Sequence, residues 1–111
     1  MTVNFVPVLG QQPIAASVVT LYTALADQCV VPSIVVLNTS GSGDTYTVHR
    51  VPQGSTPSVL TKILLDQPIA GKERQSWTEK WFLKLGDMIQ VVSVGGNVLF
   101  HMTAIENSTD A

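Results

Sequence analysis

The stretch from Ser17 to Tyr46 constrains the fold more than any other part of this chain, because two β-branched runs are followed there by a loop of turn-forming residues. The second run, Val30 to Asn38 (VVPSIVVLN), is apolar on both of its alternating faces, which is typical of a strand buried on two sides. The loop Thr39 to Asp44 (TSGSGD) supplies the small residues that a tight turn needs. The pattern predicts sheet, turn and sheet without a catalytic helix, so function is to be sought in what the sheets bind.

Segments that alternate between apolar and polar residues recur along the chain at intervals of roughly ten residues, as in antiparallel sandwiches. We expect seven or eight strands, at Val3 to Leu9, Ser17 to Thr23, Val31 to Asn38, Thr45 to Val51, Leu60 to Asp66, Arg74 to Leu83, Met88 to Val94 and Val98 to Glu106. A helical pattern competes only at Ser58 to Asp66, where we expect one helical turn and then strand. The fold class predicted is an all-β antiparallel β-sandwich, of jelly-roll or Ig-like type.

The length of 111 residues suffices for one core and is too short for two domains of ordinary size. We therefore expect a single domain over residues 1–111, with 1–16 as a candidate extended arm and 107–111 as a frayed tail. Only 13% of the residues are charged and 45% are hydrophobic, with a mean hydropathy of +0.29. Such sparse charge predicts that part of the surface is hidden in an assembly.

The charge pattern also excludes classes of partner. The net charge of −2 lacks the basic excess that a nucleic-acid-binding protein needs. No apolar run approaches the roughly 18 residues of a membrane-spanning helix, and the N-terminus lacks the basic region of a signal peptide. We expect no nucleic-acid or membrane partner, and synthesis in a cytoplasm.

Residues for metal binding or catalysis are sparse. Cys29, His49 and His101 lie on separate predicted strands, without the spacing of a known metal motif. Neither histidine has a carboxylate close by in sequence, and there is no nucleophile elbow of the GxSxG type. We therefore expect no catalytic residue, no metal and no cofactor, and we do not expect an enzyme.

Glycine-rich and acidic turns also have simple structural explanations. Gly41 to Gly43 and Gly95 to Asn97 lie between strands and lack the lysine of a phosphate-binding loop, so we interpret both as hairpin turns. Asp44 and Asp87 lie beside glycines, where a carboxylate usually accepts hydrogen bonds from backbone N–H groups.

One segment, Lys72 to Lys84, differs from the rest because it holds four of the six basic residues and both tryptophans. In a strand, Trp77 and Trp81 share a face, which suits either the core of a half-buried strand or the anchor of a protein interface. A sugar-stacking platform is a further alternative. The candidate interface residues predicted from this segment and from the apolar run before it are Arg74, Trp77, Lys80, Trp81, Ile34 and Val36.

A series of short motifs extends along nearly the whole chain. They are Leu21-Tyr22-Thr23, the strand VPSIVVLNTS, Thr45-Tyr46-Thr47-Val48, the turn Val51-Pro52-Gln53-Gly54, Pro68-Ile69-Ala70, Leu85-Gly86-Asp87-Met88-Ile89-Gln90-Val91 and Asn97-Val98-Leu99-Phe100. In this order the motifs resemble those of a family of small tailed-phage virion proteins. The resemblance runs from about Thr20 to Ile105, and the charged segment from Lys72 to Lys84 departs from it.

The resemblance implies a compact β-sandwich of the virion, made in the host cytoplasm, that assembles as a homo-oligomer with a trimer favoured. A capsid decoration (cement) protein that binds the major capsid protein at repeated sites is the first interpretation. The alternatives are a tail, baseplate or fibre component bound to another virion protein, or a carbohydrate- or receptor-binding module that uses Trp77 and Trp81. The exposure of those two rings separates the binding module from an assembly subunit.

Overall fold

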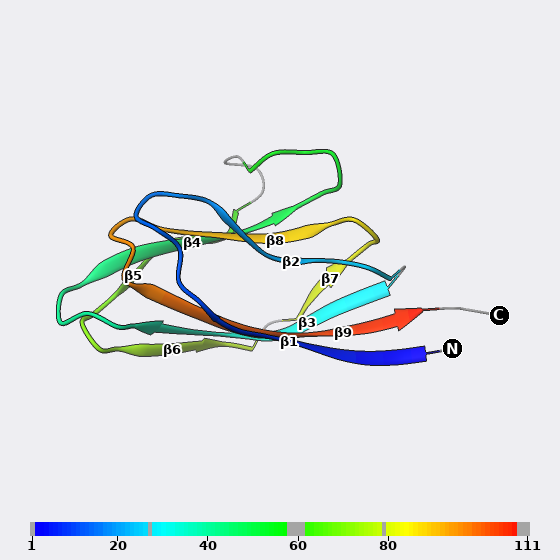
Figure 1. The fold of residues 1–111 in the computed structure, drawn as a ribbon, viewed down its shortest axis with the longest axis horizontal. Helices are drawn as coiled ribbons and strands as arrows, with labels where there is room; N and C mark the ends of the chain where they lie inside the picture. Colours follow the sequence, from blue (N-terminus) through cyan, green and yellow to red (C-terminus); the bar gives the residue numbers. More distant parts are fainter. Residues whose placement is uncertain (1, 27, 58–61, 79, 109–111) are drawn as a thin grey trace.

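The computed structural model describes residues 2–26, 28–57, 62–78 and 80–108. These residues form two antiparallel sheets that pack face to face as a sandwich, which confirms the predicted fold class (Figure 1). The described strands are β1 (Thr2–Gln11), β2 (Val19–Thr23), β3 (Gln28–Asn38), β4 (Asp44–Val51), β5 (Lys62–Ile69), β6 (Arg74–Trp77), β7 (Trp81–Leu83), β8 (Met88–Ser93) and β9 (Val98–Ser108).

The strand order is that of a jelly roll. The first sheet has the order β1-β9-β3-β6, with β7 also paired to β3, and the second has the order β2-β8-β4-β5. The pairs are therefore nested: β4 with β5, β3 with β6 and β7, β2 with β8, and β1 with β9. A chain folded as one long hairpin and then rolled up gives this pattern, which decides between the two predicted sandwich types.

Two loops predicted as hairpin turns connect the sheets instead. The loop at 39–43 joins β3 of the first sheet to β4 of the second, and the loop at 94–97 joins β8 to β9 in the opposite direction. Their small residues make a tight bend, as the sequence indicated, but the strands on either side pair with other partners. The hairpin interpretation of Gly41 to Gly43 and Gly95 to Asn97 is therefore wrong.

A proline explains why one predicted strand is two. The sequence predicted a continuous strand from Arg74, yet β6 ends at Trp77 and β7 begins at Trp81. Both pair with β3, and the interruption lies opposite Pro32, which has no N–H to donate to a neighbouring strand. On its other side, β3 shifts register against β9 between Val30 and Ser33, around the same proline.

The other predicted strand positions agree with the structure to within a few residues. The N-terminal segment that we considered as an arm contains β1, which pairs with β9 from Thr2 to Gln11. At the other end, β9 continues through Asn107 to Ser108, and residues 109–111 lie outside the described residues. The predicted helical turn falls largely on 58–61, which also lie outside them, and β5 follows from Lys62.

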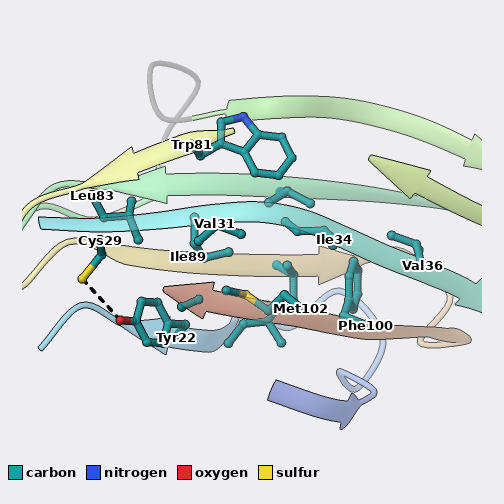
Figure 2. Packing of buried hydrophobic residues seen from close by; sticks show 14 of the residues in the cluster. Tyr22, Cys29, Val31, Ile34, Val36, Trp81, Leu83, Ile89, Phe100 and Met102 are labelled. Carbon is teal, nitrogen blue, oxygen red and sulfur yellow. Dashed lines mark hydrogen bonds between the residues drawn. The ribbon is translucent and has the colours of Figure 1, made fainter. Parts of the chain in front are cut away.

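The core lies between the two sheets and consists mainly of aliphatic side chains (Figure 2). Tyr46 and Phe100 are its largest fully buried side chains, and their rings meet edge to face with centroids 5.8 Å apart. Fully burying a side chain of this size contributes about 1.5–3 kcal/mol, so this contact between β4 and β9 is a principal link between the sheets.

Only one face of β3 is fully buried, whereas the sequence predicted burial on both. Ile34 and Val36 point between the sheets and are inaccessible to solvent. Val30, Val35 and Leu37 alternate with the buried positions and lie half-buried on the outer face of the first sheet. The described strands form two layers, so the outer face of this apolar strand has no layer above it.

Candidate interaction surface

The structure places three of the six predicted interface residues in the core. Ile34 and Val36 are fully buried, and Trp81 is 9% exposed, with its ring among the core side chains (Figure 2). Both faces of the apolar strand look alike in the sequence. The face predicted as an interface, which carries Ile34 and Val36, is the inner, buried one. These three side chains cannot anchor a partner in this fold, so their assignment to an interface is corrected.

The remaining three predicted residues lie at the edge of the first sheet. Arg74 and Lys80 are exposed, and Trp77 is half-buried against the core. The indole N–H of Trp77 donates to the Tyr46 hydroxyl at 2.7 Å, and that hydroxyl donates to Gln75 Oε1. The interface role of these three residues stays a prediction.

The same contacts determine the electrostatics of Tyr46 and the chemistry open to Trp77. Burial raises the pKa of Tyr46, the negative charge of Glu73 raises it further, and the Trp77 N–H opposes both. With Trp77 bonded inward and Trp81 buried, the two rings do not form an exposed platform for a sugar.

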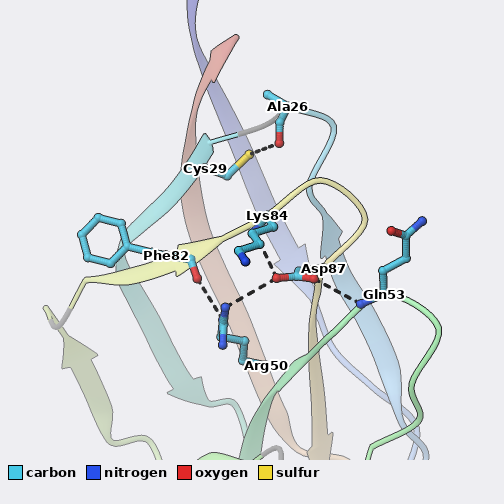
Figure 3. A network of polar contacts seen from close by, with 7 residues as sticks. All are labelled: Ala26, Cys29, Arg50, Gln53, Phe82, Lys84 and Asp87. Carbon is cyan, nitrogen blue, oxygen red and sulfur yellow. Dashed lines mark hydrogen bonds and ion pairs between the residues drawn. The ribbon is translucent and has the colours of Figure 1, made fainter. Parts of the chain in front are cut away.

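Phe82 is the surface residue that our sequence reasoning missed. On β7 the flanking residues Trp81 and Leu83 point into the core, while Phe82 points away from the sandwich and is 68% exposed (Figure 3). The sequence did indicate its position, because the alternation of side chains in this segment places Phe82 on the face opposite the tryptophans. Sequence reasoning gave more weight to the larger rings, although an exposed aromatic ring is the more informative feature.

A polar network fixes the backbone beneath Phe82. Arg50 Nε donates to the Phe82 carbonyl at 2.9 Å, and Arg50 Nη2 lies 3.5 Å from Asp87 Oδ2 (Figure 3). The Asp87 carboxylate also accepts from the backbone N–H groups of Gln53 at 3.1 Å and Lys84 at 3.0 Å. This confirms the predicted capping role of Asp87, which ties together β4, the loop after it and the β7–β8 turn.

The glycine before Asp87 is required by the same turn. Gly86 has a φ of +88°, and a Cβ at this position would lie 2.6 Å from Cδ of Gln53. The positive φ would strain any other residue here, and its side chain would also have to displace the flexible side chain of Gln53. The Gly86-Asp87 pair in the phage-like motif thus has a structural explanation in this turn.

An apolar groove of about 720 Å³ lies beside Phe82. Its lining comes from strands β3, β4, β7 and β9 and from the turn after β7, and consists of Gln28, Cys29, Val30, Arg50, Phe82, Leu83, Lys84, Ile105 and Asn107. Aliphatic and aromatic side chains make its walls, and Arg50 and Lys84 bring positive charge to it. The groove is of the size that proteins use to hold small apolar groups or side chains of a partner.

At the other end of the sandwich, Asp44 organises the β8–β9 loop. Its carboxylate accepts from the backbone N–H groups of Thr45 at 2.7 Å, Gly95 at 2.8 Å and Asn97 at 3.2 Å, and from the Ser93 hydroxyl at 3.2 Å. Burial alone would raise the pKa of Asp44, but these donors outweigh it and lower the pKa. The predicted capping role of Asp44 is confirmed.

We expect this cap to make stability sensitive to acid. Because its pKa is lowered in the folded state, the stabilisation is fully present above the unfolded pKa of about 3.9 and is lost as pH falls through the folded value. Asp44→Asn should lower the free energy of unfolding by about 2 kcal/mol at pH 7. Chemical denaturation from pH 7 to pH 3 tests this, with Asp66→Asn as the comparison, because Asp66 Oδ1 accepts from the Thr47 hydroxyl at 3.1 Å and an amide oxygen can keep that bond. A difference from wild type that does not shrink toward pH 3 would contradict the prediction.

Cys29 lies in a small buried polar cluster. The Tyr22 hydroxyl is 3.5 Å from Cys29 Sγ and donates to Glu106 Oε2, and burial raises the pKa of Tyr22, as do Cys29 and Glu106. Within the described ranges, no three His, Cys, Asp or Glu side chains converge as a metal site would require. The described ranges contain no helix that is long and apolar enough to cross a membrane.

Comparison with known proteins identifies the fold but no family. No protein-family model matches the sequence, and no curated protein matches it. A solved structure described as "Bacillus endospore appendages form a novel family of disulfide-linked pili" is similar over 97% of this chain and 88% of its own, with 14% identity and a TM-score of 0.60.

A second solved structure, described as "Structure of infectious bursal disease virus Gx strain", is similar over 98% of this chain, with 8% identity and a TM-score of 0.53. This chain spans 32% of the length of that viral chain. At these identities the two comparisons show that the jelly-roll sandwich is shared.

Proposed function

We propose that this chain is a structural subunit of a tailed-phage virion, and specifically a capsid decoration protein that self-associates and binds repeated sites on the shell. The observation that carries the proposal is a jelly roll whose surface exposes several large apolar side chains. They lie in loops at both ends of the sandwich and on the outer face of the first sheet: Phe5, Ile14, Val18, Leu25, Phe82, Leu85 and Val94.

The sparse charge of the sequence supports an assembled role. With 13% charged residues, this surface would favour association over a freely soluble monomer. The two solved structures add support because one is described as a pilus and the other as a virus, and both are assemblies. The phage-like motifs of the sequence favour a virion among assemblies.

The competing binding-module function has lost its main support. A lectin-type site needs exposed rings surrounded by polar groups, and Trp81 is buried while Trp77 is half-buried. A tail, baseplate or fibre component shares every feature that supports a decoration protein, so it is the alternative that an experiment must separate.

In multi-angle light scattering at micromolar concentration, we expect the purified protein to have at least twice the 11.9 kDa mass of one chain. A monomer at all concentrations would contradict the self-association part of the proposal. Immunogold labelling of virions that carry this gene separates the locations. Even labelling of the head supports a decoration protein, labelling confined to the tail supports the alternative, and unlabelled particles would contradict a virion role.

A further inference from the structure

An unbroken row of apolar side chains crosses the outer face of the first sheet. In the strand register, Phe5 of β1 pairs with Ile105 of β9, Ile105 pairs with Val30 of β3, and Val30 pairs with Phe82 of β7. Residues directly opposite each other in neighbouring strands point to the same face of a sheet. The row therefore runs from one edge of the sheet to the other, with Phe5 and Phe82 at its two ends.

The two ends of this row have complementary shapes. Phe5 is 70% exposed, so its ring stands above the β1 edge. At the other end, Val30, Phe82 and Ile105 line the apolar groove of about 720 Å³. The same face therefore carries a protruding ring at one edge and a recess for apolar groups at the other.

The two edges of this face also differ in charge. The β1 sequence, TVNFVPVLGQ, contains no charged residue. Cationic residues lie along the opposite edge, with Arg74 on β6 and the exposed Lys80 and Lys84 on either side of β7. If two copies met with equal edges facing, these lysines would repel each other, whereas opposite edges bring them against an uncharged strand.

We propose that this face binds the same face of a second copy of the chain, about a twofold axis parallel to the strands, with Phe5 of each copy seated in the groove of the other. Rotation about such an axis places the β1 edge of one copy over the β7 edge of the other. Each residue keeps its position along the strand direction. Phe5 of one copy then lies over the Val30 and Phe82 end of the other. The contact is isologous, so the ring and groove meet twice in one interface.

The apolar outer face of β3 supports this arrangement. The sequence predicted a strand buried on both sides, and one copy of the fold buries only the inner side. A second sheet stacked about 10 Å away would supply the missing layer over Val30, Val35 and Leu37. The inference rests on the self-association proposed above, and it specifies a twofold contact instead of the trimer that the phage resemblance implied.

The test measures self-association by sedimentation velocity over a concentration series, in the full chain. Phe5→Asp places a charge at the protruding position, and we expect it to raise the dimer dissociation constant roughly 100-fold. Ile14→Asp is the matched control, because Ile14 is 79% exposed in the β1–β2 connection, away from the row. We expect this control to leave the dissociation constant unchanged.

A charge swap distinguishes contact between copies from an indirect effect. Phe82→Lys alone should weaken the dimer, and Phe5→Asp with Phe82→Lys in one chain should recover at least about tenfold over Phe5→Asp alone. Within one copy the two positions are three strand spacings apart, about 14 Å, so the recovery requires a second copy. Melting temperatures of all variants verify that these surface changes leave the fold intact.

Different results overturn different proposals. A wild-type oligomer that Phe5→Asp leaves unchanged, or a wild-type trimer, would overturn this interface while self-association stands. A wild-type monomer at every concentration would contradict the proposed function together with this inference. Recovery in the doubly substituted chain supports the twofold contact.

Discussion

Replacing Trp81 with alanine should lower the free energy of unfolding by about 3–5 kcal/mol. The ring is 9% exposed and packs in the core from the inner face of β7. Removing it leaves a cavity that neighbouring side chains fill only in part, so the lost burial and the cavity both destabilise the fold. Because a small domain is stable by only about 5–15 kcal/mol, the variant should melt well below wild type or fail to fold at ambient temperature.

Two neighbouring substitutions serve as controls for Trp81. Thr78→Ala and Lys80→Ala remove exposed side chains that precede the same ring and lie outside the groove, so each should change the free energy of unfolding by less than about 0.5 kcal/mol. Urea denaturation followed by circular dichroism measures all three. If Trp81→Ala retained wild-type stability and lost only self-association, the ring would lie at the interface that the sequence first suggested.

The error at Ile34 and Val36 has the same origin as the success in predicting β3. An apolar run with β-branched residues identifies a strand without ambiguity, and β3 lies where it was expected. Which of its faces points inward depends on an alternation between apolar and polar positions, and here both phases are apolar. A shift of one residue exchanges the faces, so the sequence could not choose between Ile34 and its neighbour Val35.

Turn chemistry was predictable where its causes are local. The carboxylates of Asp44 and Asp87 accept from N–H groups of residues at positions +1 and −3, within reach of a sequence pattern. The strands that a turn connects are a different matter, because β3 pairs with β6, β7 and β9, and their positions depend on the whole topology. The glycine-rich loops were therefore correctly identified as tight bends and wrongly assigned to hairpins.

The candidate surface required the same long-range information. Phe5, Ile105, Val30 and Phe82 are unremarkable in the sequence, since each lies in a different alternating segment. They become one row only when the register of three strand pairs is known. The sequence did show that both faces of β3 are apolar. This indicates that a further layer covers the outer face, but not where that layer comes from.

Removing the Asp87 carboxylate should have the second large effect, because one group holds several parts of the chain. We expect Asp87→Ala to lower the free energy of unfolding by about 2–4 kcal/mol. The backbone N–H groups of Gln53 and Lys84 would lose their acceptor, and Arg50 would lose its ion pair. The Arg50 side chain is 39% exposed, so solvent screens that pair and the two backbone donors account for most of the loss.

A double-mutant cycle separates these contributions. Arg50→Ala should cost less than Asp87→Ala, because it leaves both backbone donors paired, and the coupling between the two substitutions should be about 1 kcal/mol or less. Asp87→Asn keeps one oxygen acceptor and should fall between wild type and Asp87→Ala. Urea denaturation of the four variants and wild type supplies the cycle. An Arg50→Ala loss as large as that of Asp87→Ala would show that the ion pair, and not the backbone cap, stabilises this end of the sandwich.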